Sequence, residues 1–309
     1  MKRKGLPLHG WLNLDKPLGM TSFKALSHVK RLLNVSKLGH AGTLDPEASG
    51  ILPIALGDAT RLIEYCQDMD KIYRFTVNWG ASTTTDDAAG EIIATQLSRP
   101  KKEEILSLLP HFIGNISQTP PRFSALKING QRAYDLAREG EDFEIKSRLV
   151  TVHHLQLLDH GVDSSVFEVH CGKGTYVRSL ARDMGEKLSC LGHIATLRRL
   201  KVGNFNEKNA FSLEALEKIV HSSGVYAPLL PLTTVLDDIS ALAVSESEAQ
   251  RLRYGQTIST DRLFEKNIAK AMCNDQLVAI INCEDPLHIK PVKVFNVSNQ
   301  KGETDVDYC

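Results

Sequence analysis

The chain has 309 residues, of which 42% are hydrophobic and 24% charged, and these proportions exclude a disordered polypeptide as the default interpretation. Its 37 basic and 37 acidic residues balance, so the total charge gives no indication of a nucleic-acid partner. The distribution of charge along the chain does give such an indication, because basic residues predominate over 1–46 and 171–201, whereas acidic residues predominate after residue 231. On charge alone, phosphate-facing surfaces and ordinary solvated faces are equally good explanations of the basic segments.

The six cysteines form no CxxC pair and show no paired spacing, so the sequence predicts neither a zinc site nor a disulfide framework and fits a reducing compartment. The N-terminal stretch is basic but lacks an apolar segment of signal-peptide length. No run of residues is long and apolar enough to span a membrane. We therefore expect a cytoplasmic protein without membrane contact.

The first predicted elements are a helix and a glycine-rich loop. Apolar residues recur at helical spacing over 21–34, and Thr21 or Ser22 is available as the N-cap. The loop GHAGTLDPEASG follows over 39–50. Its glycines permit close backbone approaches, and the proline after Asp45 biases that residue toward extended geometry. The sequence therefore predicts an acid held at a fixed point on an irregular loop.

A strand is the clearest element of the next segment. The stretch KIYRFTVNW over 71–79 alternates strictly between apolar and polar residues and places Tyr73 on the apolar face. A short helix capped by Asp58 is expected before it, over 58–66. We further expect helices over 102–109, 130–139 and 175–188, and strands over 149–158, 165–171, 277–283 and 290–297.

Familiar phosphate-loop and deaminase motifs are absent from the sequence. CGKGTYVRS has neither the GxxxxGK[ST] order nor the GxGxxG order, and no H-x-E with P-C-x-x-C is present. What remains is an acid on a glycine loop (Asp45), a strand tyrosine (Tyr73) and an arginine that begins a basic helix (Arg178). Each of these alone is more often a turn, core or solvated residue.

Together with their neighbours, these residues match a family. The segments GHAGTLDPEASGILPIALGDATRL, KIYRFTVNWGASTTTDDAAG, PPRFSALKINGQRAYDLAREG, GKGTYVRSLARDMGEKL and LRRLKVGNF resemble, in order and spacing, the signature blocks of the bacterial tRNA pseudouridine synthases that act on uridine 55, the TruB family. The resemblance covers roughly residues 8–205.

The resemblance implies an α+β fold. A pseudouridine synthase catalytic domain over 1–232, with a mixed, largely antiparallel central sheet, would carry a thumb-like RNA-binding insert over 121–148. A small β-rich, PUA-like C-terminal domain would follow over 233–309. The implied activity is isomerisation of uridine 55 in the T loop of tRNA, by base flipping, cleavage of the ribose–N1 bond and formation of a ribose–C5 bond. It needs no cofactor and no metal.

The family's catalytic aspartate falls on Asp45, as nucleophile or as the base that starts glycosidic cleavage. An acid enclosed beside an uncharged uracil needs a cation to keep it ionised, and Arg178 is expected to pair with it bidentately. Tyr73 offers a face on which the flipped base stacks, worth about 1–3 kcal/mol, which is comparable with the cost of unstacking.

Other positions follow from the resemblance with more specific roles. His40 would intrude into the T loop, or else stabilise its own loop. Tyr176 and Leu197 would line the uridine pocket, and Asp87 would contact the base or the backbone. Arg198 and Arg199 would contact phosphates, together with Lys201. Where relatives read T-D-T-x-D, this chain has Thr84 in place of the first acid, which leaves the role of that loop open.

Two alternatives stay open. A non-catalytic RNA-binding protein or tRNA-folding chaperone on the same scaffold is disfavoured by the intact Asp45, Tyr73 and Arg178 set, because binding anionic RNA does not require an acid. A guide-RNA-dependent pseudouridine synthase would bring long basic tails and protein partners. We expect no guide RNA and a monomeric protein.

Overall fold

The structure is a computed structural model that describes residues 5–124, 126–128 and 130–296. Within these residues a nine-stranded sheet runs in the order β1-β3-β12-β4-β11-β10-β7, with β2 beside β3 and β13 beside β12. The strands are β1 (Gly10–Lys16), β2 (Leu38–His40), β3 (Ala48–Leu56), β4 (Lys71–Trp79), β7 (Gly114–Gln118), β10 (Arg148–His160), β11 (Ser164–Cys171), β12 (Gly192–Val202) and β13 (Phe205–Asn206).

The pairing of the sheet is mixed but mostly antiparallel. Among the described strands of this nine-stranded sheet, only β3 and β12 run parallel, with Leu197 opposite Ala48. This junction joins the half of the sheet that carries the Asp45 loop to the half that carries Tyr73. The predicted mixed, largely antiparallel sheet is confirmed.

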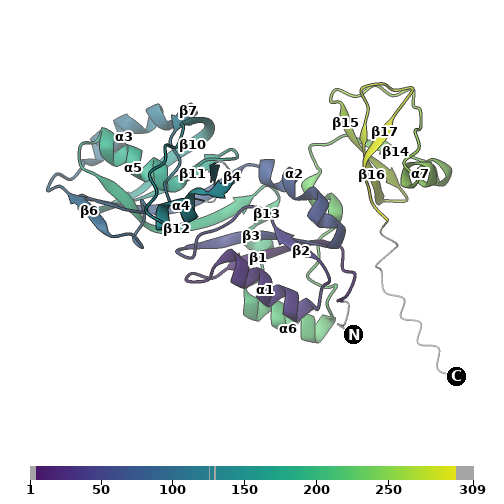
Figure 1. Cartoon of the computed structure of the whole chain (residues 1–309), viewed down its shortest axis with the longest axis horizontal. Coiled ribbons are helices and arrows are strands. Elements are labelled where there is room, and N and C mark those ends of the chain that lie inside the picture. The colour runs from purple at the N-terminus through teal and green to yellow at the C-terminus, as the bar shows by residue number, and fades with distance from the viewer. Residues whose placement is uncertain (1–4, 125, 129, 297–309) are drawn as a thin grey trace.

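Helices cover the two halves of the sheet separately (Figure 1). α1 (Ser22–Leu33) and α6 (Leu213–Ser223) pack with β1 and β3, whereas α5 (Val177–Lys187) packs with β4 and β11. Further helical segments are η1 (Gly57–Leu62), α2 (Ile63–Asp68), α3 (Lys102–Leu108), η2 (Leu109–Phe112), η3 (Glu207–Asn209) and η4 (Leu232–Val235), and α4 and α7 are described below. No helix among the described residues is both long enough and apolar enough to cross a membrane.

The insert expected over 121–148 contains a short hairpin and one helix. The hairpin pairs β8 (Lys127–Ile128) with β9 (Gln131–Arg132), and α4 (Ala133–Arg138) follows directly. The helix is therefore shorter than predicted, because Gly130 lies in a turn and Gln131 and Arg132 belong to the hairpin. A second hairpin pairs β5 (Ala81–Thr83) with β6 (Ile92–Thr95).

A smaller four-stranded sheet forms the C-terminal β-rich domain. It contains β14 (Ala241–Ala243), β15 (Ile268–Cys273), β16 (Gln276–Asn282) and β17 (Lys290–Val294), with α7 (Glu246–Arg253) beside them. Leu277, Ile280 and Phe295 join a buried cluster with Trp11 and Leu236, so the two sheets share apolar contacts. The division at residues 232 and 233 stays a prediction, as does the resemblance to a PUA domain.

One local prediction was wrong. Residues 58–66 do form helical turns, but η1 begins after Leu56, with no side-chain cap, and Asp58 lies inside the first turn. Its carboxylate instead faces His9, at 3.4 Å between Oδ2 and Nδ1. By contrast, Thr21 caps α1 as expected, accepting a hydrogen bond from the Lys24 backbone N–H at 3.1 Å.

Candidate active site

The loop that carries Asp45 is held from both sides by buried polar side chains. The Ser22 hydroxyl donates to the Leu44 carbonyl at 2.8 Å, and the Leu44 backbone N–H donates back to it at 2.9 Å. On the other side, Arg199 donates from Nη2 to the Gly42 carbonyl at 3.0 Å and from Nε to the Ile51 carbonyl at 2.7 Å. These bonds fix the backbone on either side of the acid.

Glycine is required at one end of this loop. Gly50 has φ +101, and a Cβ built on it would lie 2.2 Å from the Arg199 carbonyl oxygen. Any other residue would therefore push β3 away from β12 at their parallel junction. The loop glycine is what lets the two halves of the sheet meet beside Asp45.

Asp45 and Arg178 meet as expected, but through one contact. Arg178 Nη2 lies 3.0 Å from Asp45 Oδ2, and the arginine side chain is 7% exposed while the aspartate is 43% exposed. The rest of the guanidinium is occupied, because Nη1 donates to the Thr85 carbonyl and Nη2 to the Phe123 carbonyl, each at 2.9 Å. The prediction of a bidentate pair was wrong, because two backbone carbonyls take up the other donors of the guanidinium.

Asp87 lies behind this pair. Its Oδ2 is 3.6 Å from Arg178 Nη1, and its Oδ1 accepts hydrogen bonds from the Thr85 hydroxyl at 2.6 Å and the Ala89 N–H at 3.1 Å. The buried carboxylate thus balances part of the arginine's charge. Thr84, the replacement for a family acid, accepts from the Glu91 N–H at 3.1 Å and so closes the β5–β6 hairpin.

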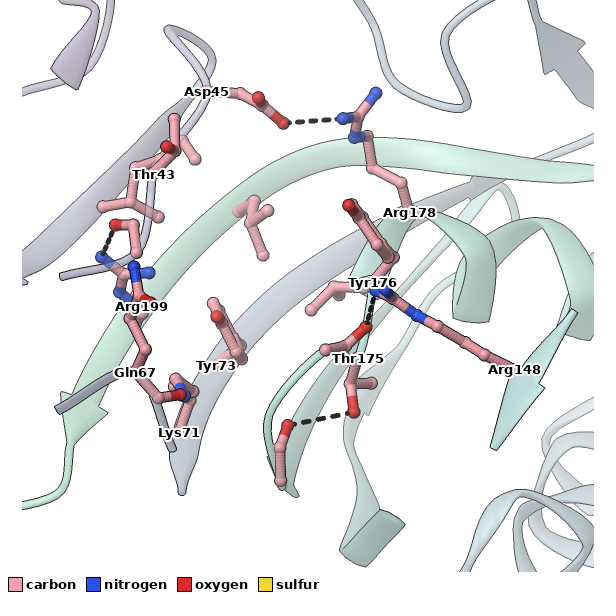
Figure 2. Close-up of a pocket in the computed structure, with 17 residues that line it drawn as sticks. Thr43, Asp45, Gln67, Lys71, Tyr73, Arg148, Thr175, Tyr176, Arg178 and Arg199 are labelled. Carbon is pink, nitrogen blue, oxygen red and sulfur yellow. Dashed lines mark hydrogen bonds and ion pairs between the residues drawn. The ribbon is translucent and has the colours of Figure 1, made fainter. Parts of the chain in front are cut away.

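Asp45 opens onto a cavity of about 310 Å³ (Figure 2). Its polar lining is mostly cationic or aromatic, and Asp45 is the acid among its lining residues. The lining consists of Gly42, Thr43, Leu44, Asp45, Ala48, Gln67, Lys71, Tyr73, Arg148, Gly172, Gly174, Thr175, Tyr176, Val177, Arg178, Leu197 and Arg199. Such a pocket suits a planar, uncharged ring attached to an anionic backbone.

Tyr73 lies in this cavity on β4, away from the Asp45–Arg178 pair (Figure 2). Burial raises the pKa of its hydroxyl, and the positive charge of Arg199 acts in the opposite direction. At neutral pH the side chain is a neutral phenol that lines the cavity.

Tyr176 and Leu197 also line the cavity. Tyr176 is the N-cap residue of α5, and its ring lies 5.1 Å from the Arg148 guanidinium carbon. Both backbone polar groups of Tyr176 bond to the buried Gln118, whose Nε2 donates to the carbonyl at 3.1 Å and whose Oε1 accepts from the N–H at 2.8 Å. These two bonds fix the position of the first turn of α5, which carries Arg178.

The three remaining predicted residues lie at different depths. Arg199 is 2% exposed and bonded to backbone carbonyls, so the structure places it as a support of the loop and cavity wall rather than as an exposed phosphate contact. Arg198 is partly exposed, but Asp15 and Glu207 hold its guanidinium at 2.8 Å and 2.7 Å. His40 lies on β2, half-buried, and burial together with Arg199 lowers its pKa.

Sequence reasoning missed several residues of the site. Lys71, Gln118, Ser22 and Arg148 were not predicted to contribute, although the first and last line the cavity. Burial and the charge of Arg199 lower the pKa of Lys71, whose ammonium donates to the Gln67 and Met69 carbonyls. The position of Lys71 at the first residue of the tyrosine strand was a usable signal. Gln118 and Ser22 carried none, because their partners are backbone atoms distant in sequence.

Comparison with known proteins decides the family. The family description "TruB family pseudouridylate synthase (N terminal domain)" matches residues 30–177, and "tRNA pseudouridylate synthase B C-terminal domain" matches 178–237. A tRNA pseudouridine synthase B of Caulobacter vibrioides is 45% identical over 96% of this chain and 99% of its own length. The chain belongs to the TruB family. The tRNA pseudouridine synthase B of Ehrlichia ruminantium is 47% identical over 94% of this chain and 100% of its own length. That of Nitrobacter winogradskyi is 52% identical over 83% of this chain and 74% of its own length.

Solved structures resemble this TruB-family chain in fold. A Cbf5-Nop10-Gar1 complex contains a chain with TM-score 0.71 and 24% identity, covering 93% of this chain and 85% of its own. An H/ACA RNP bound to a substrate RNA containing 2'-deoxyuridine contains a chain with TM-score 0.73 and 22% identity, and the match covers 96% of this chain and 91% of the other. At this level of identity the similarity concerns the fold of both domains.

Proposed function

We propose that this TruB-family protein isomerises uridine 55 in the T loop of tRNA to pseudouridine, without a guide RNA, as a cytoplasmic monomer. The observation that carries the proposal is the ionic contact of Asp45 with Arg178 at one end of a cavity that also contains Tyr73. Binding alone would not favour a carboxylate beside anionic RNA. The alternative of a non-catalytic RNA-binding protein leaves Asp45 unexplained.

The reaction conserves all atoms and electrons, since pseudouridine is an isomer of uridine. The bond between ribose C1' and uracil N1 breaks, the ring turns, and C1' bonds to C5. The proton at C5 is then lost, and N1 gains a proton. The site needs only an anion beside the sugar and ring, a surface that holds the detached ring, and an acceptor for the C5 proton.

The residues of the cavity match these needs. Asp45 supplies the anion, as nucleophile or base, and Arg178 stabilises its charged form when uracil displaces water. The Tyr73 ring supplies a stacking face, and its hydroxyl is available for proton transfer. Lys71, Arg148 and Arg199 make the cavity wall positive, which favours an attached phosphate backbone.

The test is incubation of the purified protein with an unmodified tRNA transcript, followed by mapping of pseudouridine at single-nucleotide level. We expect one product, at position 55, in the absence of any other RNA or protein. A transcript with cytidine at that position is the matched control and should give none. Absence of product from the wild-type protein, with binding of the transcript intact, would support the non-catalytic alternative instead.

A further inference from the structure

A second cluster of chemically active side chains lies outside the cavity. Asp70, His153 and His170 place one carboxylate oxygen and two imidazole nitrogens within 4.8 Å of one another. His153 Nε2 lies 3.1 Å from Asp70 Oδ1, and His170 Nε2 lies 3.4 Å from Asp70 Oδ2. All three side chains are about 40–50% exposed, so the cluster is open to solutes.

We propose that Asp70, His153 and His170 form a binding site for one divalent transition-metal ion of the Zn²⁺ class. Two imidazole nitrogens and one carboxylate oxygen are a donor set that such ions prefer. With metal–ligand distances of about 2.0–2.2 Å, the ligand atoms of a tetrahedral site are about 3.4 Å apart. Each histidine Nε2 lies at about this distance from an Asp70 oxygen, but from a different one, so an ion bound by a single oxygen requires a shift of the carboxylate or of one imidazole. The sequence predicted no metal site because its cysteines show no metal-binding spacing, and the ligands of this cluster include no cysteine.

Backbone irregularity brings the two histidines together. Val152 pairs with Cys171 and His154 with His170, so His153 is an extra residue in a β-bulge of β10. Its side chain and that of His154 are both exposed, whereas Val152 and Leu155 on either side are buried. A bulge of this kind redirects a side chain that regular pleating would place elsewhere. Here the bulge accompanies the approach of His153 to His170, whose ring centroids are 4.8 Å apart.

The charges around the cluster favour a cation. A hollow of about 380 Å³ beside it is lined by Asp70 and His170 and by three further acids, Asp68, Asp237 and Asp238. Lys201 lines the same hollow, and Lys173 pairs with Asp68 at 3.0 Å, so the excess of acids is modest. Three protein ligands leave a coordination position for water or an external oxygen.

The ion would act as a clamp on the strand that carries Tyr73. Asp70 directly precedes β4, while His170 lies on the adjacent β11 and His153 on β10, the next strand of the sheet, so one ion joins the start of β4 to both of these strands. An ion that binds the folded chain and not the unfolded one raises the temperature of unfolding. This role does not depend on the reaction proposed for the cavity.

Calorimetric titration of the metal-free, full-length protein with ZnCl₂ at neutral pH tests the site, with thermal unfolding as a second readout. We expect one equivalent to bind and the unfolding temperature to rise. His153→Gln and His170→Gln, with folding checked by circular dichroism, should each weaken Zn²⁺ affinity at least tenfold and remove the thermal shift. His288→Gln is the matched control, because His288 pairs with Asp285 at 2.8 Å and no third ligand joins them within the part of the chain that the structure describes, so both readouts should stay unchanged.

Several outcomes would overturn the proposal. These are no saturable binding of Zn²⁺, equal binding by the two variants and the wild type, or Mg²⁺ binding as tightly as Zn²⁺. Chelator treatment separates this site from the catalytic proposal, because it should remove the thermal shift and leave pseudouridine formation unchanged. Loss of turnover on chelation would contradict a purely stabilising role of the ion, because either the reaction or the placement of Tyr73 would then depend on the metal.

Discussion

Arg178 contacts Asp45 through one 3.0 Å contact between Nη2 and Oδ2, while its guanidinium also binds the carbonyls of Thr85 and Phe123. One buried cation thus joins the Asp45 loop, the segment between β5 and β6, and the insert. The position of the Arg178 guanidinium therefore depends on three segments that lie far apart in the sequence. Substitutions at either member of the pair should therefore affect activity in different ways.

Asp45→Asn is expected to abolish turnover and keep tRNA affinity, because the amide matches the shape of the carboxylate but supplies no anion. Loss of one acid–base group costs typically about 10²–10⁴-fold in rate, and loss of a nucleophile costs more. Pseudouridine formation and filter binding measure the two effects. Asp163→Asn, at an exposed ion pair with Arg99, is the control and should behave as wild type. Measurable isomerisation by pure Asp45→Asn would refute the catalytic assignment.

Arg178→Lys should keep the positive charge beside Asp45 and lose the planar arrangement of donors that the guanidinium provides. A lysine ammonium cannot reproduce the planar set of bonds to two carbonyls and one carboxylate. We expect kcat/KM to fall at least tenfold, equivalent to about 1.4 kcal/mol of transition-state stabilisation. Steady-state kinetics on the transcript measure it, with Arg74→Lys, at an exposed pair with Glu168, as control. Wild-type kinetics for Arg178→Lys would show that charge alone is sufficient.

Two substitutions at Tyr73 separate its ring from its hydroxyl. Tyr73→Phe keeps the stacking face, so RNA affinity should change little, whereas Tyr73→Ala should lose about 1–3 kcal/mol of binding free energy. If the hydroxyl transfers the C5 proton, Tyr73→Phe also loses turnover at saturating RNA. Single-turnover kinetics with binding titrations measure both effects, and the exposed Tyr254→Phe is the control. Unchanged affinity in Tyr73→Ala would exclude a stacking role.

The sequence predicted the elements whose pattern is local. α1 and β4 were predicted because apolar residues recur at helical spacing in one and alternate in the other. β3 and β12 escaped prediction although their parallel pairing joins the two halves of the sheet. Eight of the nine β3 residues are buried, so no alternation is visible, and β12 carries arginines that a linear pattern suggests are exposed.

The same limit applies to the site. Asp45, Tyr73 and Arg178 were found through motifs and lie around one cavity. Arg199 was misjudged, because its burial depends on carbonyls at Gly42 and Ile51 that no nearby sequence reveals. The Asp70, His153 and His170 cluster was missed for a related reason, since its members lie far apart in sequence and one of them depends on a β-bulge.

Lys16 gives a pH-dependent prediction. It is fully buried, its ammonium donates to the carbonyls of Pro17 and Met20, and burial lowers its pKa from 10.5 to about 8. Between these pH values the unfolded chain binds more protons than the folded chain, so this residue makes stability rise as pH rises from about 8 to about 10.5.

Urea unfolding of the wild type and Lys16→Met across that range measures the effect as a difference. The wild type should gain stability relative to the variant, on the order of 1–3 kcal/mol. Lys24→Met, at an exposed position of α1, should track the wild type. A constant difference between wild type and Lys16→Met at all pH values would mean that Lys16 keeps an ordinary pKa in the folded chain.

Gln118→Met tests whether the start of α5 positions Arg178. The substitution removes the partner of the Tyr176 N–H and one partner of its carbonyl, and a buried donor left unpaired costs about 1–3 kcal/mol. We expect the free energy of unfolding to fall by that amount. Because Tyr176 and Arg178 then lose a fixed helix start, kcat should fall as well.

Gln118→Glu provides the contrast, because its carboxylate still accepts from the Tyr176 N–H and loses only the bond to the carbonyl, which also accepts from Leu180 at 3.2 Å. This variant should therefore recover much of the lost kcat. Urea unfolding and single-turnover rates separate the two effects. A Gln118→Met protein that lost stability but turned over at the wild-type rate would show that Gln118 supports the fold without positioning Arg178.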